Sequence, residues 1–262
     1  MSVAMRKDKS SYIIQNVSHA LVLLEQFKGG DAELGVTELS RRLALQKNNV
    51  FRLLATLEAR NFIEQNRSTG GYRLGLKNLE LGQATARQTG LQTLARPVLE
   101  SLAARLNETI YLAVLKDTCV VLLDELESTR PVRAVSRRGA WLPLHCTAAG
   151  KVLLSVLSET EQFLHLPANL ERYTGRTVTE PEELRLQLQQ VAERGYAVES
   201  EEFEGSVCSV SAPIRNGNNI VVAALAISGP VMRFGAERLA DELLPAVRQA
   251  ATDISARLGC VD

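Results

Sequence analysis

The sequence predicts an α+β protein in which an N-terminal winged helix-turn-helix is joined by a helical linker to a second domain built on an antiparallel sheet. Three observations support this prediction. Residues 46–60 carry apolar side chains at i, i+3, i+4 and i+7, which is one face of an α-helix. A short hairpin pattern follows at residues 62–74, and strand-like runs between amphipathic helices fill the rest of the chain.

Size and composition are those of an ordinary globular protein. The 262 residues are enough for about two domains. No apolar run reaches the ~18 residues that span a bilayer, so we expect no membrane partner. The four cysteines form no CxxC pair and no apolar secretory segment follows the N-terminus, which favours a reducing, cytoplasmic location without a structural zinc site.

The formal net charge of zero conceals an uneven distribution. Residues 1–75 contain 11 Lys and Arg against 7 Asp and Glu, whereas the remaining residues contain 19 against 23. A basic N-terminal part on an acidic body is typical of a separate module that binds a polyanion.

The N-terminal part reads as an arm followed by three helices. The first helix is predicted over residues 14–28 and ends at a Gly-Gly pair. A second, short helix begins after Val36 with Thr37 as its N-cap, and a tight link joins it to the helix at residues 46–60. The predicted boundaries are 1–11 for a mobile arm, 12–75 for the winged helix-turn-helix, 76–90 for the linker helix and 91–262 for the second domain.

A hairpin is predicted directly behind the third helix, with strands at residues 62–65 and 72–74. The leading end of the third helix offers amides and cations, which contact base edges and phosphates in a helix-turn-helix. A surface helix and a solvated turn would explain each feature alone, but three helices and a hairpin in this order favour DNA binding. The candidate DNA-contacting residues are Gln46, Lys47, Asn48, Asn49, Phe51, Arg52, Arg67 and Arg73.

The segment LGVTELSRRLALQKNNVFRLLATLEARNFIEQNRSTGGYRLG resembles the winged helix-turn-helix of the IclR family of bacterial transcription regulators. Asn48 and Asn49 stand where small hydroxyl residues are common in that family, and Phe51 stands where Tyr or His is common. The resemblance implies the fold and double-stranded DNA as a partner, while these departures leave the operator sequence open. The matching positions are Val50, Arg52, Leu53, Leu54, Thr56 and Leu57 in the helix, and Tyr72, Leu74 and Gly75 in the wing.

The second domain alternates helical and strand-like patterns. Strands flanked by helices indicate an antiparallel sheet with helices packed on it. The Asn- and Gly-rich turn at residues 216–219 joins the last two strands into a hairpin. Helices are predicted at residues 91–107, 147–157, 180–194 and 233–257, and strands at 109–115, 119–126, 132–137, 196–203, 208–214 and 220–228.

Three further segments resemble the IclR effector domain, a fold similar to GAF domains. They are LPLHCTAAGKVLLS at residues 142–155, GYAVESEEFEGSVCSVSAPI at 195–214 and AALAISGP at 223–230. Together with the N-terminal match, the resemblance covers nearly the whole chain. It implies a GAF-like domain that binds a small organic acid or aromatic metabolite, and we expect no cofactor.

Small residues at 148–150 open a predicted helix, where free backbone N–H groups and the helix dipole favour an anion. Close packing of that helix on the sheet explains the same residues equally well. Glu199 stands where the family typically has Asp, and Ala226 where some relatives have Ser, so we expect an effector larger or less polar than glyoxylate or pyruvate. The candidate effector-contacting residues, most of them implied by the resemblance, are Leu142, Ala148, Ala149, Gly150, Glu199, Cys208, Ala226 and Ser228.

The sequence gives less support to a catalytic site or a metal site. His145 and Cys146 are adjacent, so on a strand their side chains point to opposite faces and cannot form a Cys–His pair. The acidic run from Glu199 to Glu204 lacks a histidine and indicates a solvated strand edge, and no Gly-rich phosphate motif is present. A GAF-like thiol redox enzyme using Cys146 or Cys208 is the alternative, although a helix-turn-helix has no evident role in one.

The sequence therefore predicts a ligand-responsive DNA-binding regulator that is not an enzyme. As a homodimer or homotetramer it would place two winged domains in successive major grooves of a pseudo-palindromic operator. Asn48 and Asn49 are the candidates for base reading, and Lys47, Arg52 and Arg67 for phosphate contacts. The sequence leaves open whether the protein represses or activates transcription.

Overall fold

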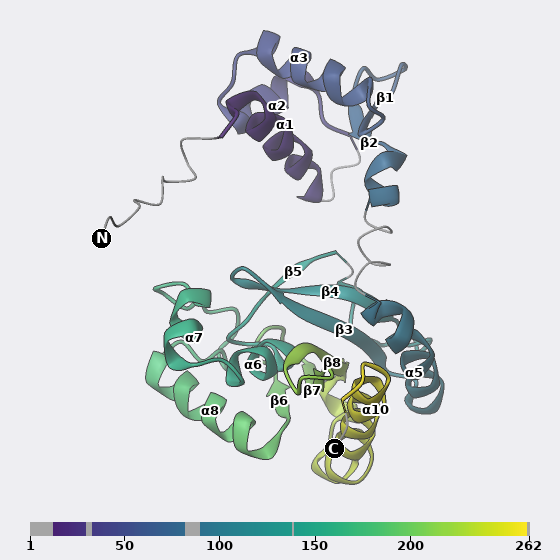
Figure 1. The fold of residues 1–262 in the computed structure, drawn as a ribbon, viewed down its shortest axis with the longest axis vertical. Helices are drawn as coiled ribbons and strands as arrows, with labels where there is room; N and C mark the ends of the chain where they lie inside the picture. Colours follow the sequence, from purple (N-terminus) through teal and green to yellow (C-terminus); the bar gives the residue numbers. More distant parts are fainter. Residues whose placement is uncertain (1–12, 30–32, 82–89, 138, 261–262) are drawn as a thin grey trace, which may run out of the picture. The chain divides into compact units, whose positions relative to one another are not determined.

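The computed structural model describes residues 13–29, 33–81, 90–137 and 139–260. The chain divides into two compact units, one within residues 1–85 and one within residues 86–262 (Figure 1). The predicted arm at residues 1–11 lies outside the described residues, as do positions 82–89 of the predicted linker helix; residues 76–81 are helical.

The N-terminal unit contains the three helices and the two-stranded antiparallel hairpin that the sequence predicts, and the helical residues 76–81 follow the hairpin. In the hairpin, Ile63 faces Leu74 and Gln65 faces Tyr72. Apolar side chains from all of these elements meet in one small core that includes Leu23, Leu54 and Tyr72. The elements are α1 (Gln15–Glu25) with a 3-10 turn (Gln26–Gly29), α2 (Val36–Leu43), α3 (Lys47–Glu58), β1 (Ile63–Gln65) and β2 (Tyr72–Leu74).

The start of α2 differs from the prediction. Thr37 is not its N-cap, because the helix already begins at Val36, Gly35 occupies the cap position and no side chain caps it. At the other end, Ala44 adopts a left-handed conformation with φ of 53°, and its N–H donates to the carbonyl of Arg41. This tight C-terminal turn allows α3 to begin three residues later.

The C-terminal unit is a six-stranded antiparallel sheet of order β5-β4-β3-β8-β7-β6. The chain places β8 between β3 and β7, so its last long strand completes the centre of the sheet. The strands are β3 (Thr109–Lys116), β4 (Cys119–Leu126), β5 (Trp141–Pro143), β6 (Ala197–Ser200), β7 (Val207–Arg215) and β8 (Val221–Pro230). The helices are α5 (Leu91–Leu106), α6 (Ala148–Ser155), α7 (Glu159–His165), α8 (Pro181–Arg194), α9 (Ala236–Arg238) and α10 (Leu244–Arg257), with a 3-10 turn at Val231–Arg233 and a π-turn at Leu239–Leu243.

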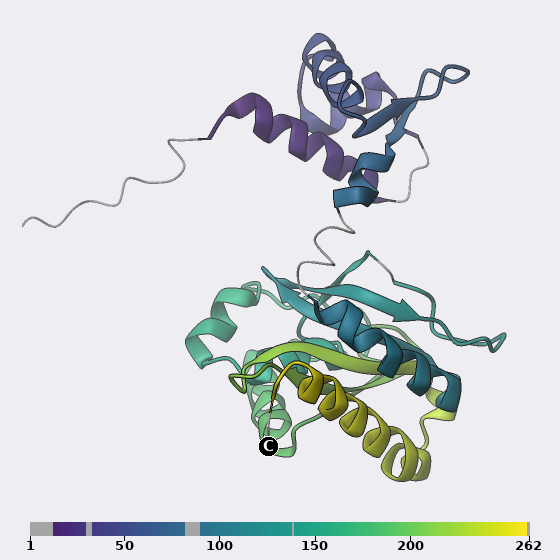
Figure 2. The same cartoon turned by 45° about the vertical axis from the view of Figure 1, so that its right-hand side comes forward.

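The two faces of this sheet carry different helices (Figures 1 and 2). Ile110, Val210 and Leu225 point to one face and pack against α5 and α10. Tyr111 and Ala226, one position away on the same strands, point to the other face, which is covered by α6 and α8. Because side chains alternate along a strand, each strand contributes to both cores.

Residues 132–137 are not the strand that the sequence predicts. They form an extended segment, and the hydroxyl of Ser136 and the N–H of Arg137 donate to the carboxylate of Glu125 at 2.7 and 3.2 Å. The place next to β4 is taken by β5 instead, where Leu142 pairs with Val120. The backbone N–H of Arg137 thus has a side-chain carboxylate as its hydrogen-bond partner in place of a neighbouring strand.

Helix α7 and strand β5 are further differences from the predicted elements, and residues 233–257 are not one continuous helix. Within the described residues, the structure has no helix with the length and apolarity needed to cross a bilayer.

Candidate functional site

The outer surface of α3 and its N-cap carries six of the eight predicted DNA-contacting residues, and the hairpin carries the other two, Arg67 and Arg73. Val50, Leu54 and Leu57 are buried against the rest of the unit. At 100° per residue, Asn48 and Arg52 lie on the face opposite that core. Gln46, Lys47, Asn48, Asn49, Phe51 and Arg52 are all exposed.

Asn49 lies on the flank of this surface. With Arg52 and Thr56 it lines a groove between α3 and α1, to which α1 contributes Val17 and Leu21. Asn48 therefore projects more directly away from the unit than Asn49 does.

The four predicted DNA-contacting cations, on α3 and the hairpin, differ in their partners. Lys47, Arg52 and Arg67 have no carboxylate at salt-bridge distance within the described part of the chain. Arg73 pairs with Glu64 across the hairpin, with Nη2 at 3.1 Å from the carboxylate. The first three are thus better placed to neutralise phosphates than Arg73 is.

A residue that the sequence reasoning missed holds the tip of the hairpin in place. The carboxylate of Glu33, which precedes α2, accepts hydrogen bonds from Asn66 Nδ2 and Thr69 Oγ1, both at 2.6 Å. These two hydrogen bonds lower the pKa of Glu33. They fix the turn that carries Arg67.

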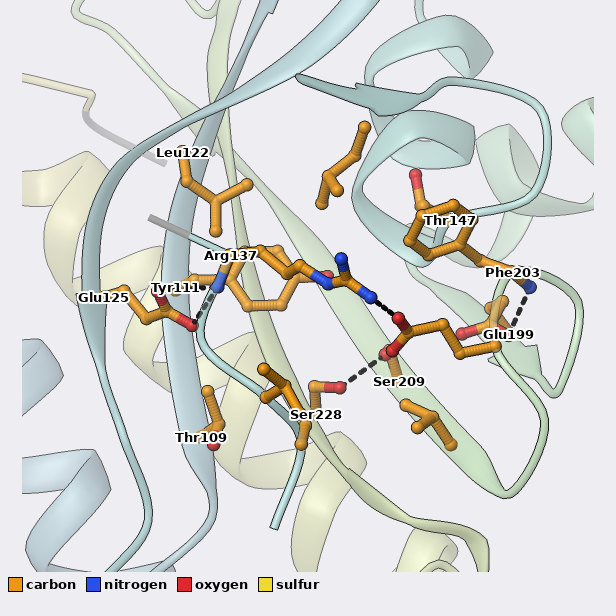
Figure 3. Close-up of a pocket in the computed structure, with 15 residues that line it drawn as sticks. Thr109, Tyr111, Leu122, Glu125, Arg137, Thr147, Glu199, Phe203, Ser209 and Ser228 are labelled. Atoms are coloured by element: carbon orange, nitrogen blue, oxygen red, sulfur yellow. Dashed lines mark hydrogen bonds and ion pairs between the residues drawn. The ribbon is translucent and has the colours of Figure 1, made fainter. Parts of the chain in front are cut away.

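The C-terminal unit contains a cavity of about 40 Å³ on the α6 side of its sheet (Figure 3). Its polar wall includes the Ser209 hydroxyl, which donates to the Ser228 hydroxyl at 2.9 Å. Tyr111 lies beside them, and burial raises the pKa of its phenol. The lining residues are Thr109, Tyr111, Leu122, Glu125, Ala134, Val135, Arg137, Leu142, Thr147, Glu199, Phe203, Glu204, Val207, Ser209 and Ser228.

Three of the predicted effector-contacting residues, Leu142, Glu199 and Ser228, lie together on this wall. Ala226 is on the same face of the sheet but outside the lining, one strand repeat from Ser228. The sequence predicts that Cys208 contacts the effector, but Cys208 does not line the cavity. Its side chain belongs to the opposite core beneath α5 and α10. Its neighbour Ser209 takes the cavity-facing position.

The small residues at the start of α6 are explained by close packing. A Cβ on Gly150 would lie 2.2 Å from the carbonyl oxygen of Leu144. The Gly150 N–H donates to the Thr147 hydroxyl at 3.2 Å, which caps the helix. Ala148, Ala149 and Gly150 are all buried and none lines the cavity, although the capping Thr147 does.

The acidic run is not a solvated strand edge, which corrects the prediction. Glu199 is 3% exposed, and its carboxylate accepts the N–H groups of Glu202 and Phe203 at 2.7 and 3.4 Å. Burial, with the charge of Glu202 nearby, raises the pKa of Glu199 to about 7. Glu202 is itself buried and paired with Lys151. Two members of the run, Glu199 and Glu202, are thus buried against hydrogen-bonding partners, and no local pattern in the sequence indicates that burial.

Arg137 and Glu204 are cavity residues that the sequence reasoning did not select. Arg137 extends across the cavity (Figure 3) and forms an ion pair with Glu204. Its guanidinium carbon also lies 5.7 Å from the centre of the Phe203 ring. The only signal in the sequence was a basic residue in the segment read as a strand.

The thiols and histidines do not assemble a reactive site. Burial raises the pKa of the Cys146 thiol and raises that of Cys208 to about 12, so neither is a ready thiolate. His145 Nε2 is 3.0 Å from the carbonyl oxygen of Glu171, as expected for a satisfied residue at a helix entrance. In the described residues, no group of three His, Cys, Asp or Glu is arranged to hold a metal ion.

Comparison with known proteins gives matches along nearly the whole chain. Residues 83–256 match the family model described as bacterial transcriptional regulator IclR C-terminal, and residues 17–67 match the IclR helix-turn-helix domain. The chain is 36% identical to the HTH-type transcriptional regulator XynR of Escherichia coli (strain K12), covering 94% of this chain and 98% of that protein. It is 34% identical to KdgR, an HTH-type transcriptional regulator of the same organism, covering 97% of each.

Among solved structures, the chain resembles an IclR homolog from Microbacterium hydrocarbonoxydans complexed with 4-hydroxybenzoate. The TM-score is 0.82 at 27% sequence identity, and the match covers 93% of this chain and 98% of that one.

Proposed function

This chain belongs to the IclR family of bacterial transcriptional regulators. We propose that it binds a small organic acid or aromatic metabolite and that this binding changes its affinity for operator DNA. Residues 12–75 are the proposed DNA-binding domain, 76–90 the linker and 91–262 the GAF-like effector domain. The relatives are regulators rather than enzymes, so the thiol enzyme alternative is set aside.

The observation that carries the DNA-binding half of the proposal is the outer face of α3. Asn48 and Arg52 project from it, and Lys47 lies at its leading end without a carboxylate partner among the described residues. A carboxamide bridges adenine N6 and N7, and unpaired cations bind phosphates. We therefore assign base reading to Asn48 and Asn49 and phosphate contacts to Lys47, Arg52 and Arg67.

The effector half of the proposal rests on the cavity of the C-terminal unit. It is the place where polar side chains from β3, β6, β7 and β8 meet on one face of the sheet. The 4-hydroxybenzoate bound to the similar solved structure supports a carboxylate ligand for this fold. A pseudo-palindromic operator, a homodimer or homotetramer and a cytoplasmic location complete the proposal.

A gel-shift titration with DNA from the protein's own promoter region tests the proposal. We expect affinity that falls steeply as salt rises, because phosphate contacts release counterions. Candidate acids should change that affinity, and a thermal-shift screen should identify those that bind. Absence of salt-sensitive binding with and without acids would overturn the proposal, and glyoxylate as the strongest stabiliser would contradict the expectation of a larger or less polar effector.

A further inference from the structure

Arg137 stands out among the residues that line the effector cavity. It is the only cation among the described lining residues, which also include the carboxylates of Glu125, Glu199 and Glu204. Its Nε is buried and has no hydrogen-bond partner within the part of the chain that the structure describes. A buried, unsatisfied guanidinium nitrogen is costly unless a ligand or water takes its hydrogen.

The three carboxylates differ in how firmly they are engaged. Glu125 accepts the Ser136 hydroxyl and the backbone N–H of Arg137, and Glu199 accepts two backbone N–H groups. Among the described residues, the carboxylate of Glu204 has Arg137 as its partner, and its side chain is 29% exposed. Of the three carboxylates, that of Glu204 can therefore turn towards solvent without losing a hydrogen bond from a backbone N–H group.

The cavity is too small for an effector while this pair is closed. Its volume of about 40 Å³ gives room for roughly one to three water molecules. An organic acid of several heavy atoms needs the wall to move, and Arg137 with Glu204 is its least enclosed polar part, since their side chains are 40% and 29% exposed. The ring of Phe203 lies beside the guanidinium of Arg137, and this contact can remain when the Glu204 carboxylate turns away.

We propose that the effector is an organic acid whose carboxylate replaces that of Glu204 on Arg137. The exchange leaves the charge around Arg137 unchanged, because one carboxylate takes the place of another. A neutral ligand would have to separate the same ion pair without offering a replacement, so the pair selects for acids. Ser228 accepts the Ser209 hydroxyl hydrogen and lines the cavity, so its own hydroxyl hydrogen can be donated to a polar group elsewhere on the ligand. This inference rests on the proposed function, since it names the ligand chemistry of the same cavity.

Replacing Arg137 and replacing Glu204 should change the affinity for acids in opposite directions. This difference separates a role in ligand recognition from a purely structural role. Isothermal titration of the full chain with 4-hydroxybenzoate, gluconate and pyruvate, and with the corresponding amides as uncharged controls, provides the measurement. Arg137→Gln should weaken acid binding about tenfold or more, because it removes a charge-assisted contact. Glu204→Gln should tighten acid binding about threefold or more, because it removes the internal competitor.

Arg133→Gln is the matched control, since Arg133 lies in the same segment and pairs with Glu127 at 3.2 Å on the surface. It should leave acid binding unchanged. Weaker binding in both pair variants, equal binding of acids and amides, or no acid binding in the wild type and Glu204→Gln would overturn the inference. Gel shifts on promoter DNA report the proposed function separately, because they show DNA binding whether or not the pair selects acids.

Discussion

Lys151 donates to both carboxylate oxygens of Glu202, at 2.5 and 2.6 Å, while its side chain is only 2% exposed. The same ammonium donates to Gln187 Oε1 at 2.7 Å. This pair joins α6 to the loop after β6, where the N–H of Glu202 also donates to the carboxylate of Glu199. A charge at this depth is tolerated only because its partners are in place.

Removing one member of the pair should therefore destabilise the effector domain strongly. We expect Lys151→Met to lower the free energy of unfolding by about 3–5 kcal/mol, because Glu202 would be left buried without its cation. The double variant Lys151→Met with Glu202→Leu should recover a large part of the loss. Denaturant unfolding of both variants measures this, and a double variant that is less stable than the single one would contradict the expectation.

The raised pKa of Glu199 predicts a pH dependence of stability. Its value of about 7 exceeds its ordinary value of 4.5, so the folded protein binds this proton more tightly than the unfolded chain does. The stability contributed by this group is full below pH 4.5, is lost as pH rises towards 7 and is absent above it. Glu199→Gln stays neutral, so it should stabilise the protein at pH 8 by on the order of 2 kcal/mol and have little effect at pH 4.5.

Melting temperatures across this pH range test the Glu199 prediction. Glu183→Gln, at an exposed position on α8, serves as the control and should show no such pH-dependent gain. Equal stabilisation by Glu199→Gln at both ends of the range would exclude titration as the cause.

Gly150→Ala should damage the packing of α6. The added Cβ would lie 2.2 Å from the carbonyl oxygen and 2.6 Å from the Cα of Leu144, and backbone atoms cannot move aside cheaply. We expect a loss of about 2–3 kcal/mol in the free energy of unfolding. Gly175→Ala is the control, because nothing lies within 4 Å of its Cβ position. Similar melting temperatures for the two variants would refute the packing explanation.

Glu33→Ala should weaken DNA binding although it removes a negative charge from the DNA-binding unit. Without its hydrogen bonds to Asn66 and Thr69, the turn that carries Arg67 loses its fixed geometry. A purely electrostatic effect would instead tighten binding. Gel-shift affinities of the variant and the wild type at one salt concentration distinguish the two, and tighter binding would show that the hydrogen bonds do not matter for the wing.

Arg52→Ala and Asn48→Ala should affect DNA binding in different ways. The first should weaken operator and random DNA alike and reduce the salt slope by about 1, as expected for a phosphate contact. The second should relax preference at one base pair, and more so than Asn49→Ala, because Asn48 lies further from the groove beside α1. Arg105→Ala on α5 controls for loss of one exposed cation. Equal loss on operator and random DNA for Asn48→Ala would count against base reading.

The N-terminal unit shows which parts of the fold local sequence patterns can predict. Val50, Leu54 and Leu57 recur at helical spacing and are buried in α3, and Tyr72 begins β2 as predicted. These elements are short, contiguous and joined by tight turns, so their apolar faces can meet in only a few ways. In the C-terminal unit, residues 132–137 do not form the predicted strand. Hydrogen bonds from this segment go instead to the carboxylate of Glu125, which belongs to another element.

By itself, the sequence determined the α+β class, the order of most helices and strands, the exposed amide and cationic face of α3, and the family resemblance that the comparisons confirm. Tertiary structure alone decided that Glu199 and Glu202 turn inward, that Cys208 faces away from the cavity while Ser209 faces it, and that Arg137 meets Glu204. The physical reason is the range of the interactions. Helix and strand periodicity is a property of neighbouring residues, whereas the burial of Glu202 beside Lys151 and the meeting of Arg137 with Glu204 depend on partners from distant parts of the chain.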